Sequence, residues 1–229
     1  MSLMNNWWFT EYADEIVSSL RDKELQRIPF YQQSPQFSCR CLLVAWIRGI
    51  AEELNLNNTT VHLSVYLLDI FMDNHRIVVS RLHLVALVCL LLAAKFEERD
   101  INIPKISELN SRIGNVYPLR DYVLLEFMVM NFLHWSLVLP TAAHFAEYFI
   151  VFAVRTSDMT SAPPQITTLQ NLKDAVQQKV KDFLDISLQG KYLNLCKIKG
   201  PFISIQNDAS YHIMDTFYNV HLAKKKVDS

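Results

Sequence analysis

The chain has 229 residues, of which 51% are hydrophobic and 20% are charged, and its formal net charge at pH 7 is −1. This composition provides for a buried core and excludes global disorder, and the length allows one large domain or two small ones. A near-neutral chain lacks the basic excess of a general phosphate-backbone binder, so nucleic acid is not an expected partner. The four glycines are too few for a glycine-rich phosphate loop or for many tight hairpins.

The cysteines do not form a disulfide or zinc pattern. Cys39 and Cys41 form a C-x-C pair with no second pair at zinc spacing, and Cys89 lies inside an apolar run. We therefore expect reduced core cysteines, no metal, no cofactor and an intracellular location. The most apolar stretch, residues 84–94, is shorter than the ~20 residues that cross a membrane, so it predicts a buried helix and no membrane partner.

Helical periodicity predicts an all-α fold. A helix over residues 6–20 and a connector that contains two prolines make up residues 1–36. Residues 37–138 contain five predicted helices. The third of them begins near Ser80 and is apolar on every side until its last turn, which is typical of a helix at the centre of a bundle. In the fifth, the candidate core residues are Val123, Phe127 and Met130.

A second helical unit is predicted over residues 139–189, after Pro140. It ends in a clearly amphipathic helix. Residues 190–229 give no helix of core quality, and the sequence leaves open whether this tail is ordered. Its basic run, Lys224–Lys226, is only a weak nuclear-targeting hint, and a solvated tail explains it better.

No pattern of catalytic residues is present, so we expect no enzymatic activity. Two charged residues stand out because their surroundings are apolar: Lys95 closes the central helix, and Glu126 lies in the fifth. A lysine in a last helical turn complements the negative end of the helix dipole, and a lone glutamate in an amphipathic helix is often only solvated. On the sequence alone these explanations stand beside a functional one.

Four segments, in this order, resemble signature segments of the cyclin family and, within it, the J-type cyclins. They are CRCLLVAW (39–46), YLLDIF (66–71), LLLAAKFEE (90–98) and the segment 123–145. The resemblance implies a cyclin-box five-helix bundle followed by a partial second cyclin-like helical repeat. It also implies a regulatory subunit that binds a cyclin-dependent protein kinase and activates it by holding the kinase's αC helix in place.

The resemblance assigns roles to particular residues. Lys95 and Glu126 fall on the lysine and glutamate with which cyclins bind the kinase backbone. Arg40 and Asp69 fall on an arginine and an aspartate that form a structural ion pair.

A substrate-docking patch is also implied, at Cys39, Leu42, Leu43, Trp46 and Leu82. Through this patch, cyclins bind kinase substrates and inhibitors that carry an Arg-x-Leu motif. The chain departs from the pattern where acidic residues receive that arginine, because Ala45 and Gly49 stand there, and Val79 replaces a common arginine. We expect weak or altered recognition of the motif, because an acid-to-apolar change removes a charge and a hydrogen-bond acceptor.

Two alternatives stay open. After residue 189 the chain departs from the expected second repeat, so it is interpreted as a C-terminally shortened or variant form. Such a truncated cyclin binds the kinase without activating it. A cyclin-fold adaptor for transcription or nucleic acid is the other alternative, and a steep salt dependence of DNA binding would favour it. The family implies a location in the nucleus, the cytoplasm or both.

Overall fold

The computed structural model of the chain describes residues 10–161 and 166–189. The described residues form α-helices and short 3-10 helices without a strand, in agreement with the predicted all-α class. They divide between Thr141 and Ala142 into two compact units, each of which is described by itself. The predicted tail, 190–229, lies outside the described residues, and the predicted domain boundaries stay predictions.

Two buried helices form the centre of the first unit. α3 (Asn58–Asn74) packs along α4 (Leu82–Glu97), and every residue of α3 from 59 to 72 is buried. α4 is buried on all its faces, as predicted, because residues 84–94 are continuously apolar. The window Val79–Glu97 is long and apolar enough to cross a membrane, but 67% of it is buried inside the protein, as in a core helix.

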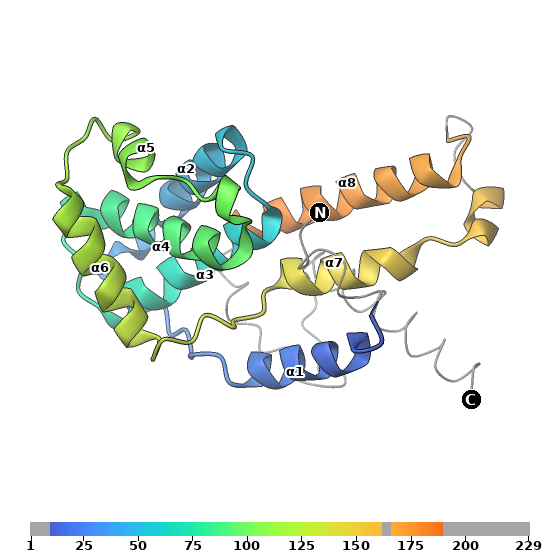
Figure 1. Ribbon diagram of the computed structural model, residues 1–229, viewed down its shortest axis with the longest axis horizontal. Helices are drawn as coiled ribbons and strands as arrows, with labels where there is room; N and C mark the ends of the chain where they lie inside the picture. The colour runs from blue at the N-terminus through green and yellow to red at the C-terminus, as the bar shows by residue number, and fades with distance from the viewer. Residues whose placement is uncertain (1–9, 162–165, 190–229) are drawn as a thin grey trace. The chain divides into compact units, whose positions relative to one another are not determined.

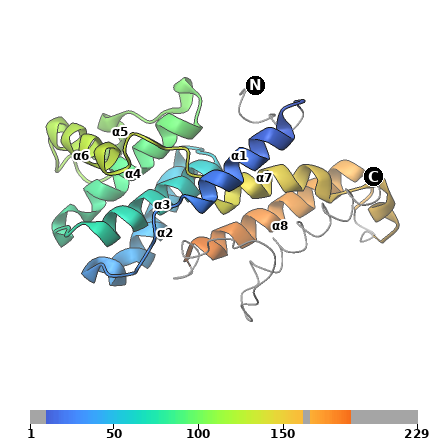
Figure 2. The same ribbon diagram turned by 90° about the horizontal axis from the view of Figure 1, so that it is seen from below.

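Three more helices cover this centre. Figures 1 and 2 show α3 and α4 between α2 (Arg40–Glu53) on one side and α5 (Ile106–Ser111) with α6 (Leu119–Phe132) on the other. α4 contacts both α2 and α6. The helices α2 to α6 therefore make the five-helix bundle that the sequence predicted, with α4 as its shared core.

Two carboxylates fasten the ends of α3 to distant parts of the chain. At its start, buried Glu98 accepts hydrogen bonds from Asn57 N (2.6 Å), Asn57 Nδ2 (2.8 Å) and Thr60 Oγ1 (2.7 Å). At its end, Asp73 accepts from the backbone N–H groups of Tyr31 and Gln33, both at 2.5 Å. Glu98 thus caps the start of α3, where a helix leaves N–H groups without partners, and Asp73 fastens the connector before α2 to the end of α3.

The N-terminal helix, α1, covers Ala13–Leu25 rather than residues 6–20. Asp14 and Glu15 lie in its first turn and Lys23 in its last, an arrangement that stabilises both ends of the helix dipole. Pro29 follows soon after the helix ends. The predicted end was therefore wrong by about a turn, and residues 1–9 lie outside the described part of the chain.

Glu24 is the buried residue of α1, and its burial makes the stability of the fold depend on pH. Loss of hydration raises its pKa from 4.5 to about 7, and the charges of Arg27 and Arg21 oppose part of this rise. The folded state therefore keeps a proton that the unfolded state releases near pH 4.5. The contribution of Glu24 to stability falls as pH rises from about 4.5 to about 7 and is constant above that range.

Replacing Glu24 with glutamine removes this loss of stability at higher pH, because glutamine does not ionise. We expect Glu24→Gln to stabilise the protein more at pH 8 than at pH 5. The gain in the free energy of unfolding should be larger at pH 8 by about 1–3 kcal/mol, and the midpoint of thermal unfolding should rise accordingly. Circular dichroism melts of both proteins at the two pH values measure it. An equal gain at both pH values would show that Glu24 does not titrate as its burial requires.

The second unit, as far as it is described, contains α7 (Ala142–Ala153), a short 3-10 helix (Thr156–Ser161) and α8 (Leu169–Gln189). α7 packs against α8. In α7 the ring centroid of Tyr148 lies 5.2 Å from that of Phe149 and 5.3 Å from that of Phe152. This helix pair occupies the region of the predicted partial second repeat.

Candidate partner-binding site

The structure brings Lys95 and Glu126 together as an ion pair, in which Lys95 Nζ donates to Glu126 Oε1. Lys95 comes from the last turn of α4 and Glu126 from the middle of α6. Their side chains are 42% and 22% exposed. The two side chains therefore form one charged site at the surface, where a binding protein can contact them.

The positions of both residues follow from how the two helices pack. Lys95 comes directly after the buried residues Ala93 and Ala94, so it is the point at which α4 leaves the core. Its charge there stabilises the negative end of the helix dipole. Glu126 lies on α6, which packs against α4.

The predicted core face of α6 was wrong. Val123 and Phe127 are 53% and 54% exposed, and Met130 is half-buried, whereas Tyr122 and Val129 are the buried residues of this helix. α6 is apolar on more than one face, so periodicity does not decide which face points inward. The inward face is the one that carries Tyr122, whose hydroxyl donates to Asn110 Oδ1 at 3.1 Å. Burial, together with nearby Tyr117, raises the pKa of Tyr122 to about 12.

As a result, α6 presents a row of large apolar side chains around Glu126. We call this row the α6 apolar face. It consists of Val123, Leu124, Phe127 and Met128, with Trp135 just beyond the helix, and their exposed fractions run from 49% to 62%. An exposed apolar surface of this kind is typical of a protein-binding site.

Trp135 is held at the surface by its backbone and by two neighbours. Its φ is 59° and that of His134 is 49°, a left-handed conformation that costs non-glycine residues about 1–3 kcal/mol each. The indole N–H donates to Asn131 Oδ1 at 3.0 Å, and the rings of Trp135 and Phe127 lie 6.0 Å apart. The sequence analysis missed this residue, and its only signal there was its position just after an apolar helix.

Arg40 and Asp69 form a buried, two-point ion pair. Arg40 Nε donates to Asp69 Oδ1 at 2.7 Å and Nη2 donates to Oδ2 at 2.8 Å, with side chains only 2% and 0% exposed. The pair joins the start of α2 to α3. Its carboxylate also faces the thiol of Cys89, whose pKa is raised first by burial and then by this negative charge.

The residues of the predicted substrate-docking patch gather at the starts of α2 and α4. Leu42 is 75% exposed, while Leu43 and Leu82 are core residues. Cys39 and Trp46 are half-buried, and the Trp46 ring meets that of His83 edge-on, with centroids 4.8 Å apart. The exposed part of the patch is thus smaller than the predicted set, and its role stays a prediction.

A five-helix bundle that exposes an ion pair within an apolar surface has features that are typical of a protein-binding domain. The cyclin N-terminal domain matches residues 15–138. Cyclin-J of Homo sapiens is 39% identical over 194 residues, which cover 82% of this chain and 52% of that protein. Cyclin-J of Xenopus laevis is 37% identical over 194 residues, which cover 82% of this chain and 50% of that protein.

Among solved structures, a viral cyclin from herpesvirus saimiri matches with a TM-score of 0.59 and 17% sequence identity, over 80% of this chain and 76% of that chain. At this identity the match shows the shared fold. The chain belongs to the cyclin family. It spans about half the length of the curated relatives it matches.

Proposed function

We propose that this chain is a regulatory subunit that binds and activates a cyclin-dependent protein kinase. The observation that carries the proposal is the Lys95–Glu126 ion pair at the edge of the α6 apolar face. Membership of the cyclin family supports the same class of partner. The ion pair and the α6 apolar face are taken together as the kinase-binding surface.

The α6 apolar face and the ion pair contribute differently to binding. Burial of the α6 apolar face supplies most of the binding free energy, as apolar cores do in other protein interfaces. Lys95 donates hydrogen bonds to a backbone carbonyl of the kinase and Glu126 accepts from a backbone N–H, which fixes the orientation of the kinase's αC helix. A correctly placed αC helix supplies the glutamate of the Lys–Glu pair that positions the nucleotide phosphates in a kinase.

Surface plasmon resonance with a set of purified cyclin-dependent kinases tests the binding step. The proposal predicts saturable binding to at least one kinase, weakened when the α6 apolar face is made polar by Phe127→Ser. The matched control is Ile101→Ser, because Ile101 is an 88% exposed apolar residue outside this face. Absence of binding to every kinase, or equal loss with both variants, would contradict the proposal.

We also propose that the substrate-docking patch binds the Arg-x-Leu motif only weakly, because Ala45 and Gly49 supply no carboxylate to accept hydrogen bonds from the arginine of the motif. No atom lies within 4 Å of the position that a Cβ would take at Gly49, so the patch has room for a larger side chain there. We expect Gly49→Glu to bind an Arg-x-Leu peptide about tenfold more tightly, from one charge-assisted hydrogen bond. Fluorescence anisotropy measures the change, with Gly49→Gln as the uncharged control. If both variants bind the peptide equally, charge at this position does not set the specificity.

A further inference from the structure

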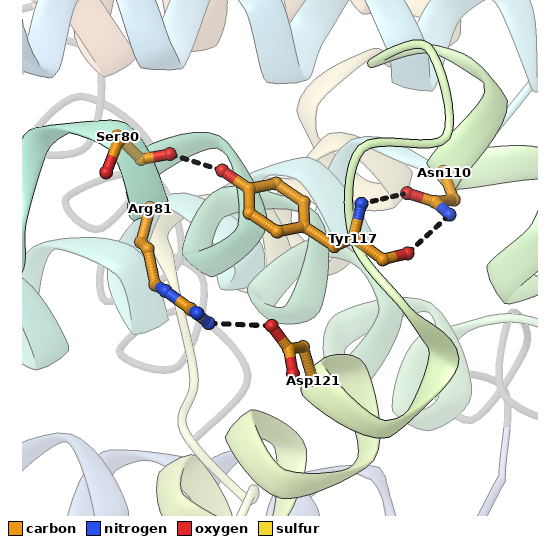
Figure 3. Close-up of polar contacts among 5 residues, drawn as sticks. All are labelled: Ser80, Arg81, Asn110, Tyr117 and Asp121. Atoms are coloured by element: carbon orange, nitrogen blue, oxygen red, sulfur yellow. Dashed lines mark hydrogen bonds and ion pairs between the residues drawn. The ribbon is translucent and has the colours of Figure 1, made fainter.

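Two segments that are distant in sequence are fastened together at the start of α4 and of α6. The Tyr117 hydroxyl donates to the carbonyl oxygen of Ser80, and Arg81 Nη1 donates to Asp121 Oδ2 at 2.8 Å. Figure 3 shows both contacts, with Ser80 and Arg81 facing Tyr117 and Asp121. Residues 76–81 and 116–121 therefore form one surface, which we call the basic apolar patch.

The patch is fixed in shape. Asn110 holds the backbone of Tyr117 from both sides: Nδ2 donates to the Tyr117 carbonyl at 2.8 Å, and Oδ1 accepts from the Tyr117 N–H at 3.4 Å (Figure 3). The Arg81 guanidinium carbon also lies 5.9 Å from the centroid of the Tyr117 ring. A surface that is already ordered loses little conformational entropy when it binds a ligand.

This ordered surface exposes four large apolar side chains. They are Val78 (68% exposed), Val79 (63%), Val116 (67%) and Leu119 (62%). The internal contacts of the patch use the backbone of Ser80 and the side chains of Tyr117, Arg81 and Asp121, so these four residues are left at the surface. Clustered exposure of this kind is typical of an interaction site.

The charge of the patch is positive. Arg76, Arg81 and Arg120 are all exposed, while Asp121 is the acidic residue of the two segments. Asp121 is already neutralised by Arg81, and this ion pair uses Nη1, so Arg81 keeps Nε and Nη2 for another acceptor. A planar guanidinium binds carboxylates well, often through two parallel hydrogen bonds.

The arginines of the basic apolar patch lie far from the Lys95–Glu126 ion pair. Arg81 and Lys95 lie at opposite ends of α4, roughly 20 Å apart along the helix at 1.5 Å per residue. Along α6, Leu119 is about 10 Å from Glu126 by the same measure, and one turn, about 6 Å, from Val123 at the edge of the α6 apolar face. A partner that binds the arginines of this patch is therefore distinguished from the kinase by not contacting the Lys95–Glu126 ion pair.

We propose that the basic apolar patch binds an acidic peptide segment of a partner protein. Large apolar side chains of that peptide pack on the exposed valines and leucine, and flanking Asp or Glu carboxylates bind the arginines. The apolar contacts provide affinity for such a segment, and the pairing of its carboxylates with the arginines of the patch favours it over basic peptides.

Selection of a random peptide library displayed on phage against the 229-residue chain tests the proposal. The enriched peptides are expected to combine Asp or Glu with large apolar residues. Their affinities are then measured by fluorescence anisotropy on two patch variants, Val79→Ser/Val116→Ser and Arg76→Glu/Arg120→Glu. Each variant is expected to weaken binding about tenfold or more, which corresponds to the loss of one or two good contacts.

The matched control is Arg99→Glu/Ile101→Ser, which makes the same kinds of change on exposed residues beyond the far end of α4. It is expected to leave peptide binding unchanged. All variants are checked by circular dichroism, and two independent patch variants guard against a local loss of structure. A library that yields no acidic enrichment, or peptides that bind the patch variants as tightly as the wild type, would overturn the proposal.

Discussion

Replacing Asp69 with alanine is expected to lower the free energy of unfolding by about 3–5 kcal/mol, because it leaves the Arg40 charge buried without its carboxylate. Arg40 is 2% exposed and donates two hydrogen bonds to Asp69, at 2.7 and 2.8 Å. These bonds join α2 to the central helix α3. Urea unfolding followed by circular dichroism measures the loss.

Two companion variants show whether the buried charge is the cause. Replacing both partners, in Arg40→Met/Asp69→Leu, is expected to recover most of the lost stability, since an apolar pair leaves no unpaired charge. The partly exposed pair between Arg48 and Glu52, 3.9 Å apart on the same helix, is the control. Glu52→Ala is expected to change stability by about 0.5 kcal/mol or less. A double variant as unstable as Asp69→Ala would show that packing, and not charge, dominates at this site.

Removal of the Lys95–Glu126 ion pair is expected to have the largest effect on partner binding. Once a kinase covers the α6 apolar face, each of the two charges lies at a desolvated interface. A single change, Lys95→Ala or Glu126→Ala, then costs roughly 1.5–3 kcal/mol, or about 10-fold to 150-fold in affinity. Titration calorimetry with the kinase that binds the wild type measures these losses.

The controls separate binding from folding. Both side chains are partly exposed in the free chain, so the single variants are expected to keep the thermal stability of the wild type to within about 1 kcal/mol. Arg48→Ala/Glu52→Ala removes a partly exposed ion pair from α2 and is expected to leave kinase affinity unchanged. If that control loses as much affinity as Lys95→Ala/Glu126→Ala, the assignment of the kinase-binding surface is wrong.

The buried centre of the bundle was predictable from the sequence. α4 is apolar on every side from residue 84 to 94, and only a helix surrounded by others satisfies that pattern. The sequence could not predict the orientation of α6 in the same way. Its apolar residues cover several faces, and its inward face depends on Tyr122 meeting Asn110, a contact between residues 12 positions apart.

The candidate site was predictable only in part, for a similar reason. Lys95 and Glu126 stood out as charges in apolar surroundings, but their ion pair joins residues 31 positions apart on two helices. Arg40 and Asp69 are 29 positions apart, and only the family resemblance related them. Contacts such as Tyr117 with Ser80, 37 positions apart, had no signal in the sequence.

The most direct test of the central proposal is the activity of a purified cyclin-dependent kinase titrated with this chain. The expected result is a saturable rise in phosphoryl transfer to a protein substrate with the wild type, and little or none with Lys95→Ala/Glu126→Ala at the same concentration. Binding without any rise in activity would contradict activation and favour a cyclin that occupies the kinase as a competitor. A rise that the double variant reproduces in full would contradict the assignment of Lys95 and Glu126 to the kinase-binding surface.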